Sequence, residues 1–318
     1  MLTSQGAPPN GLMDLRQLEI IRAIAETGSF TGAGEKLHVS QSAISRQILI
    51  LEEELGEPVF HRIGRRIRIT PAGESLLQLS HRVFRDLQDT VSAISDTRES
   101  LRGSIGLVGG MTVCLYVFPR LLAEVRRIHP NLDMRVTVGS TQRSIEMLRS
   151  GAGDLGLLTL PIEASDLVSV PMLQEELLLV TYPSHPLAAQ KRIVPADLEK
   201  QPFVLFETGS ITRRIVEDFF GRERITPPVI METENVEIIK AMVRSGLGIS
   251  IIPWQAAAAD VSTRQLFCSR IAGVSLDRQT GWLYPKMGRL PRAVTEVMRV
   301  FETLRPQLDS LVRPSKIG

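Results

Sequence analysis

Residues 30–48 read FTGAGEKLHVSQSAISRQI, and this stretch decides how the first part of the chain folds. Ser29, just before it, can accept hydrogen bonds from the free N–H groups at a helix start, which predicts a short helix over Phe30–Leu37. After a tight turn, Ser40 can cap a second helix over Gln41–Leu55 in the same way. Two short helices joined so closely bury little surface alone, so the pattern predicts a third helix beside them.

That third helix is expected just upstream, where apolar residues recur at helical spacing from Leu15 and the pattern stops at Gly28. The three helices together would form a helix-turn-helix. The last helix, which we expect to end at Gly56, has two unlike faces. The face expected in the core carries Ala43, Ile44, Ile48 and Leu51. The face that would meet base edges in the major groove carries Ser40, Gln41, Ser42, Ser45 and Arg46.

The same stretch, continued by Leu51-Glu52 and Leu55-Gly56, is very similar to the signature of the LysR-type bacterial transcription regulators. The helix pattern alone leaves open a three-helix packing unit with no DNA role, but the long ungapped match favours DNA binding. The sequence departs from the family at Gly32 and Gly34, where alanine is usual, and at Ser42, where proline is frequent. Each glycine costs up to about 1 kcal/mol against alanine in a helix, which predicts a softer second helix.

A basic hairpin is expected after the helices, over His61–Ile69, because charged and apolar residues alternate around Gly64. Its exposed arginines would be Arg62, Arg65, Arg66 and Arg68. Such a wing can hold the phosphate backbone and so position the protein without reading sequence. A merely solvated charged hairpin is the alternative.

A long helix is predicted from Thr70-Pro71 onward, because proline is favoured at the first helical position and no other proline follows before residue 102. Two series of apolar residues recur every seven positions on it and together form a seam: Leu77, Phe84 and Val91, with Leu87, Ile94 and Leu101. An isolated helix of this length needs a partner, either the same helix of a second chain or the C-terminal domain of its own chain. The LysR-type resemblance implies pairing into a dimer, and two dimers joining as a homotetramer.

Short apolar strands alternate with amphipathic helices from Gly103 onward, in two successive cycles. This rhythm predicts a mainly parallel sheet and two α/β lobes, with a ligand at the carboxyl ends of the strands between them. The expected helices include Val113–Ile128. In the LysR-type family this domain resembles periplasmic solute-binding proteins and binds a small-molecule effector.

The fold class expected is therefore an α/β two-lobed, periplasmic-binding-protein-like effector domain, preceded by an α-helical winged helix-turn-helix domain and a long linker helix. The expected parts are a flexible N-terminal arm (1–12), the DNA-binding domain (13–70), the linker and dimerisation helix (71–102) and the effector domain (103–318). Within the last, lobe I would take about 103–160 and 258–306, and lobe II about 161–257.

The effector is expected to be a small anion, because free N–H groups and the helix dipole favour anions at helix N-termini. Hydroxyl and amide side chains that follow strands mark the candidates: Thr112, Ser140, Thr141, Thr208, Ser210, Thr233 and Asn235. Thr112 and Thr141 also match cleft positions of the family. For each of them, an ordinary helix cap is the alternative.

Other functional classes have less support. The five histidines are scattered without metal-ligand spacing, and no nucleophile elbow or phosphate loop occurs, so we expect no enzyme, no catalytic residues, no metal and no cofactor. Cys114 and Cys268 leave open a redox-responsive regulator, although nothing in the sequence brings them together. A solute-binding protein without a DNA role is a further alternative, which the helix-turn-helix opposes.

The expected partners are a double-stranded DNA operator, the effector and RNA polymerase, with no membrane. No signal peptide or run of about 20 apolar residues is visible, which predicts a cytoplasmic protein. The formal net charge is only +2, so any DNA-binding surface must be a local patch. The identity of the effector, the operator sequence and the direction of regulation have no signal in the residues.

Overall fold

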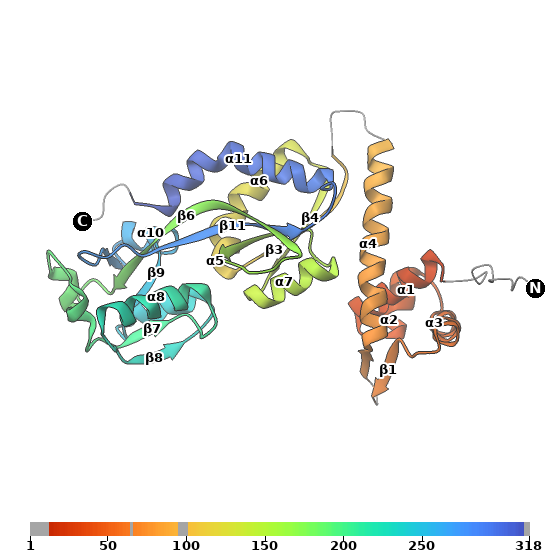
Figure 1. The fold of residues 1–318 in the computed structure, drawn as a ribbon, viewed down its shortest axis with the longest axis horizontal. Coiled ribbons are helices and arrows are strands. Elements are labelled where there is room, and N and C mark those ends of the chain that lie inside the picture. Colours follow the sequence, from red (N-terminus) through yellow and green to blue (C-terminus); the bar gives the residue numbers. More distant parts are fainter. Residues whose placement is uncertain (1–12, 64–65, 95–100, 315–318) are drawn as a thin grey trace, which may run out of the picture. The chain divides into compact units, whose positions relative to one another are not determined.

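The computed structural model of the chain describes residues 13–63, 66–94 and 101–314 (Figure 1). The chain divides into two compact units, one made of residues up to 95 with residues 150–152, and one of residues 96–149 and 153–318. The expected N-terminal arm and Arg65 of the expected wing lie outside the described residues. Each unit is described by itself.

The first unit opens with the three predicted helices. Their bounds are α1 (Leu15–Thr27), α2 (Phe30–Leu37) and α3 (Gln41–Leu55). The predicted caps are present, since Ser29 Oγ accepts a hydrogen bond from the N–H of Gly32 at 2.9 Å and Ser40 Oγ accepts one from the N–H of Ala43 at 3.2 Å. Gly56 ends α3 with a left-handed φ of 70°, as expected.

The turn between α2 and α3 depends on one of the two glycines that depart from the family pattern. A Cβ at Gly34 would lie 2.7 Å from the carbonyl oxygen of Val39, so glycine lets the turn pack closely against α2. One core prediction was wrong, because Ala43 is exposed. The other three predicted core residues of α3 are buried, together with Ile20, Ile21, Ile24 and Phe30.

A hairpin and a long helix complete the first unit. Strands β1 (Phe60–Ile63) and β2 (Arg66–Ile69) pair antiparallel, with His61 opposite Arg68. Helix α4 (Pro71–Ile94) follows and packs against α1, where Ser80 Oγ donates a hydrogen bond to the carbonyl oxygen of Leu18 at 2.9 Å.

The second unit is built around a mixed sheet in the order β10-β6-β11-β5-β3-β4, with β9 also paired to β6. Its strands are β3 (Gly103–Gly109), β4 (Leu132–Val138), β5 (Leu155–Leu160), β6 (Leu167–Thr181), β9 (Ser250–Pro253), β10 (Phe267–Ser269) and β11 (Asp277–Pro285). Strand β3 is parallel to β4 and β5, whereas β6, β9, β10 and β11 pair antiparallel. The expectation of a mainly parallel sheet therefore holds only for the first three strands.

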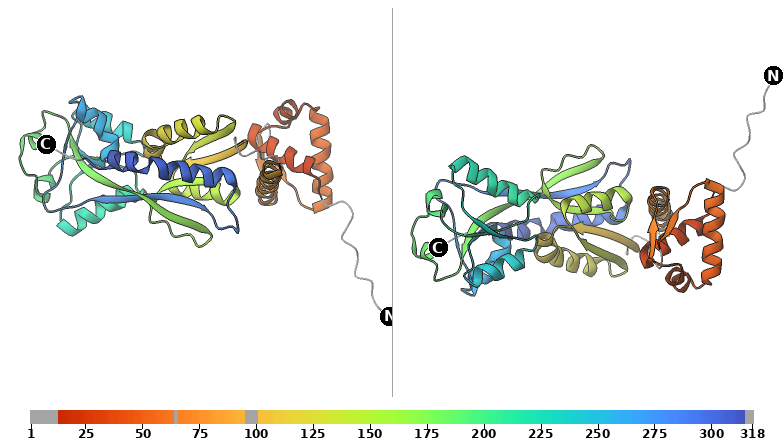
Figure 2. Two further views of the ribbon diagram at one scale, coloured as in Figure 1. Left: turned by 90° about the horizontal axis from the view of Figure 1, so that it is seen from above. Right: turned by 90° about the horizontal axis from the view of Figure 1, so that it is seen from below.

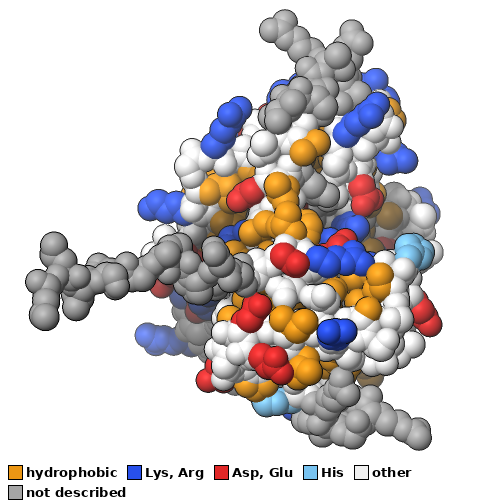
Figure 3. Space-filling model, turned by 90° about the vertical axis from the view of Figure 1, so that its right-hand side faces the viewer, with side chains coloured by type: hydrophobic (Ala, Val, Ile, Leu, Met, Phe, Trp, Pro, Cys, Tyr) orange, Lys and Arg blue, Asp and Glu red, His pale blue; other side chains and the backbone are white. Residues whose placement is uncertain are grey.

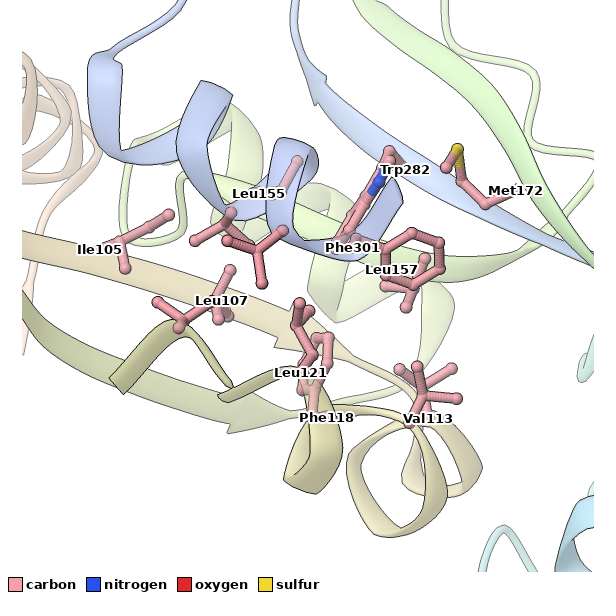
Figure 4. Close-up of a cluster of buried hydrophobic side chains, with 14 of the residues drawn as sticks. Ile105, Leu107, Val113, Phe118, Leu121, Leu155, Leu157, Met172, Trp282 and Phe301 are labelled. Atoms are coloured by element: carbon pink, nitrogen blue, oxygen red, sulfur yellow. The ribbon is translucent and has the colours of Figure 1, made fainter. Parts of the chain in front are cut away.

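Lobe I has helices on both faces of its part of the sheet (Figures 1 and 2). The helices are α5 (Met111–Tyr116), α6 (Phe118–Ile128), α7 (Thr141–Ser150) and α11 (Arg292–Val312). Figure 4 shows the core that α6 and α11 bury, in which the rings of Trp282 and Phe301 meet at 5.1 Å between centroids. The predicted helix Val113–Ile128 is in fact two helices, α5 and α6, that meet at Val117.

Lobe II contains β9, β10 and a separate parallel pair, β7 (Phe203–Leu205) and β8 (Val229–Glu232). Its helices are α8 (Ile211–Glu223), α9 (Val236–Arg244) and α10 (Trp254–Ser262), with short 3-10 turns η1 (Pro186–Ala189) and η2 (Pro195–Leu198). The helix α10 was not predicted, because its run of alanines carries little amphipathic pattern.

The two lobes are joined by long strands and not by loops. Strand β6 begins among the core residues of lobe I and ends among those of lobe II, and β11 returns beside it. The expected lobe boundaries near residues 161 and 258 are therefore corrected, since Met172 packs in lobe I whereas Leu266 and Cys268 pack in lobe II. The physical reason is that one extended strand can bury its two halves in two different cores.

The linker prediction is also corrected at its end. Helix α4 is described as far as Ile94, and residues 95–100 lie outside the described part. Leu101 precedes β3, is only 4% exposed and packs in the core of lobe I. It is therefore not part of a helix seam, because the core of the second unit takes up its side chain.

Candidate functional site

A pocket of about 350 Å³ lies between the two lobes of the second unit. Lobe I contributes the N-terminal end of α5 and the segment that joins β4 to α7, while lobe II contributes the segment between β7 and α8. Glu234 and Arg278 complete the lining. Pockets of this size take small molecules, and a ligand that filled it would touch both lobes.

Arg278 is the basic side chain of the lining. It lies on β11 and is 4% exposed. Its Nε donates a hydrogen bond to Glu175, the residue opposite on β6, and its Nη1 donates one to Thr212 Oγ1 at 2.9 Å. Its Nη2 is buried and has no partner among the described residues. A buried donor without a partner costs free energy, so an acceptor that reached Nη2 would remove that cost.

Two longer helices begin at the pocket. Ser140 precedes α7 and Ser210 caps α8, and each side-chain oxygen accepts a hydrogen bond from an N–H group of its own helix, from Arg143 at 3.3 Å and from Arg213 at 3.4 Å. Both hydroxyls therefore act as ordinary caps here. The remaining N–H groups of the first turns still favour an anion in the pocket.

The structure brings together five of the seven predicted effector residues. Thr112, Ser140, Thr141, Thr208 and Ser210 line the pocket. Thr233 and Asn235 do not line it; Asn235 Oδ1 accepts a hydrogen bond from the N–H of Glu237 at 2.9 Å and so caps α9. Asn235 thus acts as an ordinary cap, whereas the Thr233 hydroxyl accepts a hydrogen bond from the N–H of Asn235 at 3.2 Å.

Several lining residues were missed by the sequence reasoning, namely Gln142, Phe206, Glu207, Thr212 and Arg278, whereas Glu234 falls within the candidate segment 233–235. The sequence carries no clear signal for Arg278, because it stands in a polar run, residues 277–280, and Glu175 likewise stands between Gln174 and Glu176. That both charges are buried and paired is visible only in the structure. Their contact joins residues 103 positions apart and depends on the pairing of β6 with β11.

Near the pocket, a second polar cluster joins the lobes. Tyr116, at the end of α5, donates a hydrogen bond to Glu237 on α9, and Lys240 Nζ donates to Tyr116 Oη at 3.2 Å and to Glu237 Oε1 at 2.9 Å. Lys240 also pairs with the buried Asp260 at 2.7 Å. Burial and the hydrogen bond to Glu237 raise the pKa of Tyr116 to about 12, so its hydroxyl keeps its proton at neutral pH.

The two cysteines do not meet in one site. Cys114 packs against the core of lobe I and Cys268 lies in a core of lobe II. Burial raises the pKa of the Cys114 thiol to about 11 and that of Cys268 to about 12. Both thiols are therefore protonated at neutral pH, and the reactive thiolate form is disfavoured. This opposes the redox-responsive alternative.

The polar face of α3 is exposed as a recognition surface requires. Ser40, Gln41, Ser42 and Arg46 are exposed and Ser45 is half-buried. Gln41 Nε2 donates a hydrogen bond to Ser45 Oγ at 2.8 Å, and the hydroxyls of Ser40 and Ser42 lie 2.9 Å apart. On the face drawn in Figure 3, basic side chains are interspersed with acidic and hydrophobic ones.

In the predicted wing, Arg68 is exposed on β2. Arg62 and Arg66 lie on the paired strands β1 and β2, opposite Ile67 and Ile63.

On helix α4, Leu87 and Val91 are exposed by 42% and 62%. Leu77 and Phe84 are half-buried within their own unit, where the guanidinium of Arg22 lies 4.6 Å from the centroid of the Phe84 ring. Leu77 and Phe84 of the predicted seam thus already pack within the first unit.

No helix in the described part of the chain is both long and apolar enough to span a membrane. Within the same residues, no three His, Cys, Asp or Glu side chains gather closely enough to hold a metal ion.

This fold and this pocket define a class of protein in which a helix-turn-helix unit is joined to a two-lobed ligand-binding domain. The chain matches the family profile "Bacterial regulatory helix-turn-helix protein, lysR family" over residues 15–74 and "LysR substrate binding domain" over residues 98–305. It belongs to the LysR family. It is therefore a DNA-binding transcriptional regulator whose activity is modulated by a small-molecule effector, and the family and fold predictions are confirmed.

Individual relatives agree with this assignment. A RuBisCO operon transcriptional regulator of Allochromatium vinosum is 32% identical over 88% of this chain and 93% of its own length. The transcriptional activator CmpR of Synechocystis is 33% identical over 87% of this chain and 90% of its own length. A full-length OxyR variant from Pseudomonas aeruginosa shares the fold, with a TM-score of 0.76, 24% identity and coverage of 96% and 98%.

Proposed function

We propose that the effector of this regulator is a small anionic molecule that Arg278 binds between the lobes. The observation that carries the proposal is the buried Nη2 of Arg278, a charged donor that has no partner among the described residues. A carboxylate or phosphate oxygen would supply the missing acceptor, and charge-assisted hydrogen bonds of this kind are short and strong.

Other groups of the pocket would complete the binding. The N-terminal ends of α7 and α8 favour negative charge, and the hydroxyls of Thr112, Thr141 and Thr208 line the same space. Because these groups come from both lobes, a ligand that touches them all favours one arrangement of the lobes. It shifts that equilibrium only by the difference between its affinities for the two arrangements.

The test is a thermal-shift and calorimetric screen of small carboxylates and phosphates on the full-length protein. A ligand that binds only the folded state raises the melting temperature. We expect Arg278→Gln to abolish binding, and Thr112→Val or Thr141→Val to weaken it by about 0.5 to 3 kcal/mol, since each removes a hydroxyl at nearly constant shape. Binding that survives unchanged in all three variants would place the effector elsewhere.

For DNA recognition, we propose that the exposed face of α3 reads an operator while the wing contacts phosphates. The operator can be selected from random double-stranded DNA with the purified protein. Arg46→Ala should lose about 1 to 3 kcal/mol on the operator and much less on random DNA, if Arg46 reads a base. Arg68→Ala should weaken binding to both DNAs. It should also make the slope of log affinity against log salt concentration shallower by about 1, as the loss of one phosphate contact does. Equal losses on both DNAs for Arg46→Ala would assign it to the phosphate contacts.

For assembly, we propose a homodimer through α4 that joins a second dimer to form a homotetramer, with RNA polymerase as a further partner. Exposed Leu87 and Val91 support the pairing of α4 with a second copy, because a helix with an apolar seam needs a surface to cover it. Sedimentation of the wild-type protein as a monomer at micromolar concentration would refute this assembly.

A further inference from the structure

The anion site occupies only part of the pocket, and the lobe II side has the opposite charge. Glu207 and Glu234 both line the pocket. Both are exposed, and neither has an ion-pair partner among the described residues. Apart from Arg278, whose charge Glu175 offsets, these two carboxylates are the charged groups of the lining. The pocket therefore has a net negative lining beside its single anion site.

The strand register places the two carboxylates after the same end of neighbouring strands. Strands β7 and β8 are parallel neighbours, and Leu205 on β7 pairs with Glu232 on β8. Glu207 and Glu234 each come two residues after this pair, at the carboxyl ends of the two strands. Both residues lie just beyond the ends of the paired strands and both line the pocket, so two like charges stand at its lobe II edge. The N-terminal ends of α8 and α9 offset part of the repulsion, but both side chains still line the pocket.

A ligand with anionic groups alone would satisfy Arg278 and be repelled by this edge. A ligand that carries an ammonium group would instead donate hydrogen bonds to both carboxylates while its own carboxylate accepts from Arg278. We propose that the effector is a zwitterion of the amino-acid class, with its carboxylate at Arg278 and its ammonium group at Glu207 and Glu234. This inference rests on the proposed anion site and adds the second half of the ligand.

The experiment compares matched probes on the full-length protein by calorimetry and thermal shift. The probes are the standard amino acids and linear ω-amino acids, the same carbon skeletons without the amino group, and dicarboxylates of equal length. We expect at least one amino acid to bind about tenfold or more tightly than its deaminated counterpart, since a hydrogen bond to a charged group is worth at least that ratio. Dicarboxylates should bind more weakly than either.

Variants then separate the two ends of the ligand. In the double variant Glu207→Gln with Glu234→Gln, the amino acid and its deaminated counterpart should bind about equally well. The same variant should bind the dicarboxylate more tightly than the parent does. Asp218→Asn with Glu223→Gln is the matched control, because it removes two exposed carboxylates of α8 that do not line the pocket. The control should keep the parent's preference. Arg278→Gln should abolish binding of every probe.

Each outcome decides one part of the argument. If deaminated acids bind as well as amino acids and still need Arg278, the proposal of a zwitterionic effector is overturned. The proposed anion site then remains intact. A preference that persists in the Glu207 and Glu234 double variant would also overturn it. Failure of every carboxylate at millimolar concentration, together with phosphates that bind independently of Arg278, would overturn the anion site itself.

Discussion

The buried pair between Glu175 and Arg278 makes a quantitative prediction about the second unit. Glu175 is fully buried and accepts hydrogen bonds from Arg278 Nε and from Thr280 Oγ1, the latter at 2.7 Å. Glu175→Gln keeps the shape and removes the charge, so a buried guanidinium is left without its counter-charge. Breaking a buried ion pair in this way costs about 3 to 5 kcal/mol. We expect about 3 kcal/mol, because the amide oxygen of glutamine can still accept one of the two hydrogen bonds.

Urea unfolding followed by tryptophan fluorescence measures this cost in the full-length protein. Both tryptophans of the chain, Trp254 and Trp282, lie in the second unit, so the signal reports on that unit. For a unit of this size the loss corresponds to a midpoint lower by about 1 M urea. Thr280→Val is the matched control, because it keeps both charges of the pair and removes one hydrogen bond to the carboxylate, which should cost about 1.5 kcal/mol.

The double variant Glu175→Gln with Arg278→Gln tests the reasoning directly. If the cost comes from an unpaired buried charge, the double variant should be more stable than the sum of the two single losses predicts. Additive losses, or a loss below about 1 kcal/mol for Glu175→Gln, would show that the pair is not electrostatically coupled. A carboxylate or phosphate ligand should also stabilise Glu175→Gln more than the parent, because Glu175 then no longer offsets the positive charge of Arg278.

Three further predictions concern the rest of the chain. Tyr116→Phe should cost the second unit about 1 to 2 kcal/mol in the same urea assay, since it removes the hydroxyl that joins α5 to α9; an unchanged midpoint would contradict this. Hydrogen bonds from Arg299 are the main cause that lowers the pKa of Glu296 from 4.5 to about 2, so this carboxylate stabilises the fold fully above pH 4.5 and loses that effect as the pH falls toward 2. Glu296→Gln should therefore be less stable than the parent at neutral pH by an amount that shrinks below pH 4.5, and a difference that does not depend on pH would refute this. Leu87→Glu with Val91→Glu should leave the unfolding midpoint unchanged and shift sedimentation toward the monomer, whereas an intact dimer would rule out this part of α4 as the interface.

The helix-turn-helix could be predicted from sequence because its signals are local. Ser29, Ser40 and Gly56 fix where helices begin and end through contacts within a few residues of each cap. The error at Ala43 arose because helical spacing alone cannot tell the edge of an apolar face from its centre.

The effector pocket was predicted only in part, for a related reason. Hydroxyl residues at helix starts are visible in sequence, and five of the seven do line the pocket. Whether a cap faces a cleft, as at Ser210, or closes its own helix away from it, as at Asn235, depends on how the helix packs against the other lobe.

The sequence by itself determined the family, the helix-turn-helix with its caps and the presence of two α/β lobes, because each follows from short-range patterns or from a long continuous match. Only the tertiary structure decided where the chain crosses between the lobes and which charges meet there. Arg278 reaches Glu175 and the pocket through the pairing of β11 with β6, and Glu207 and Glu234 both reach the pocket after the paired strands β7 and β8. Strand pairing joins residues that are distant in the chain, and no local propensity specifies the register in which they meet.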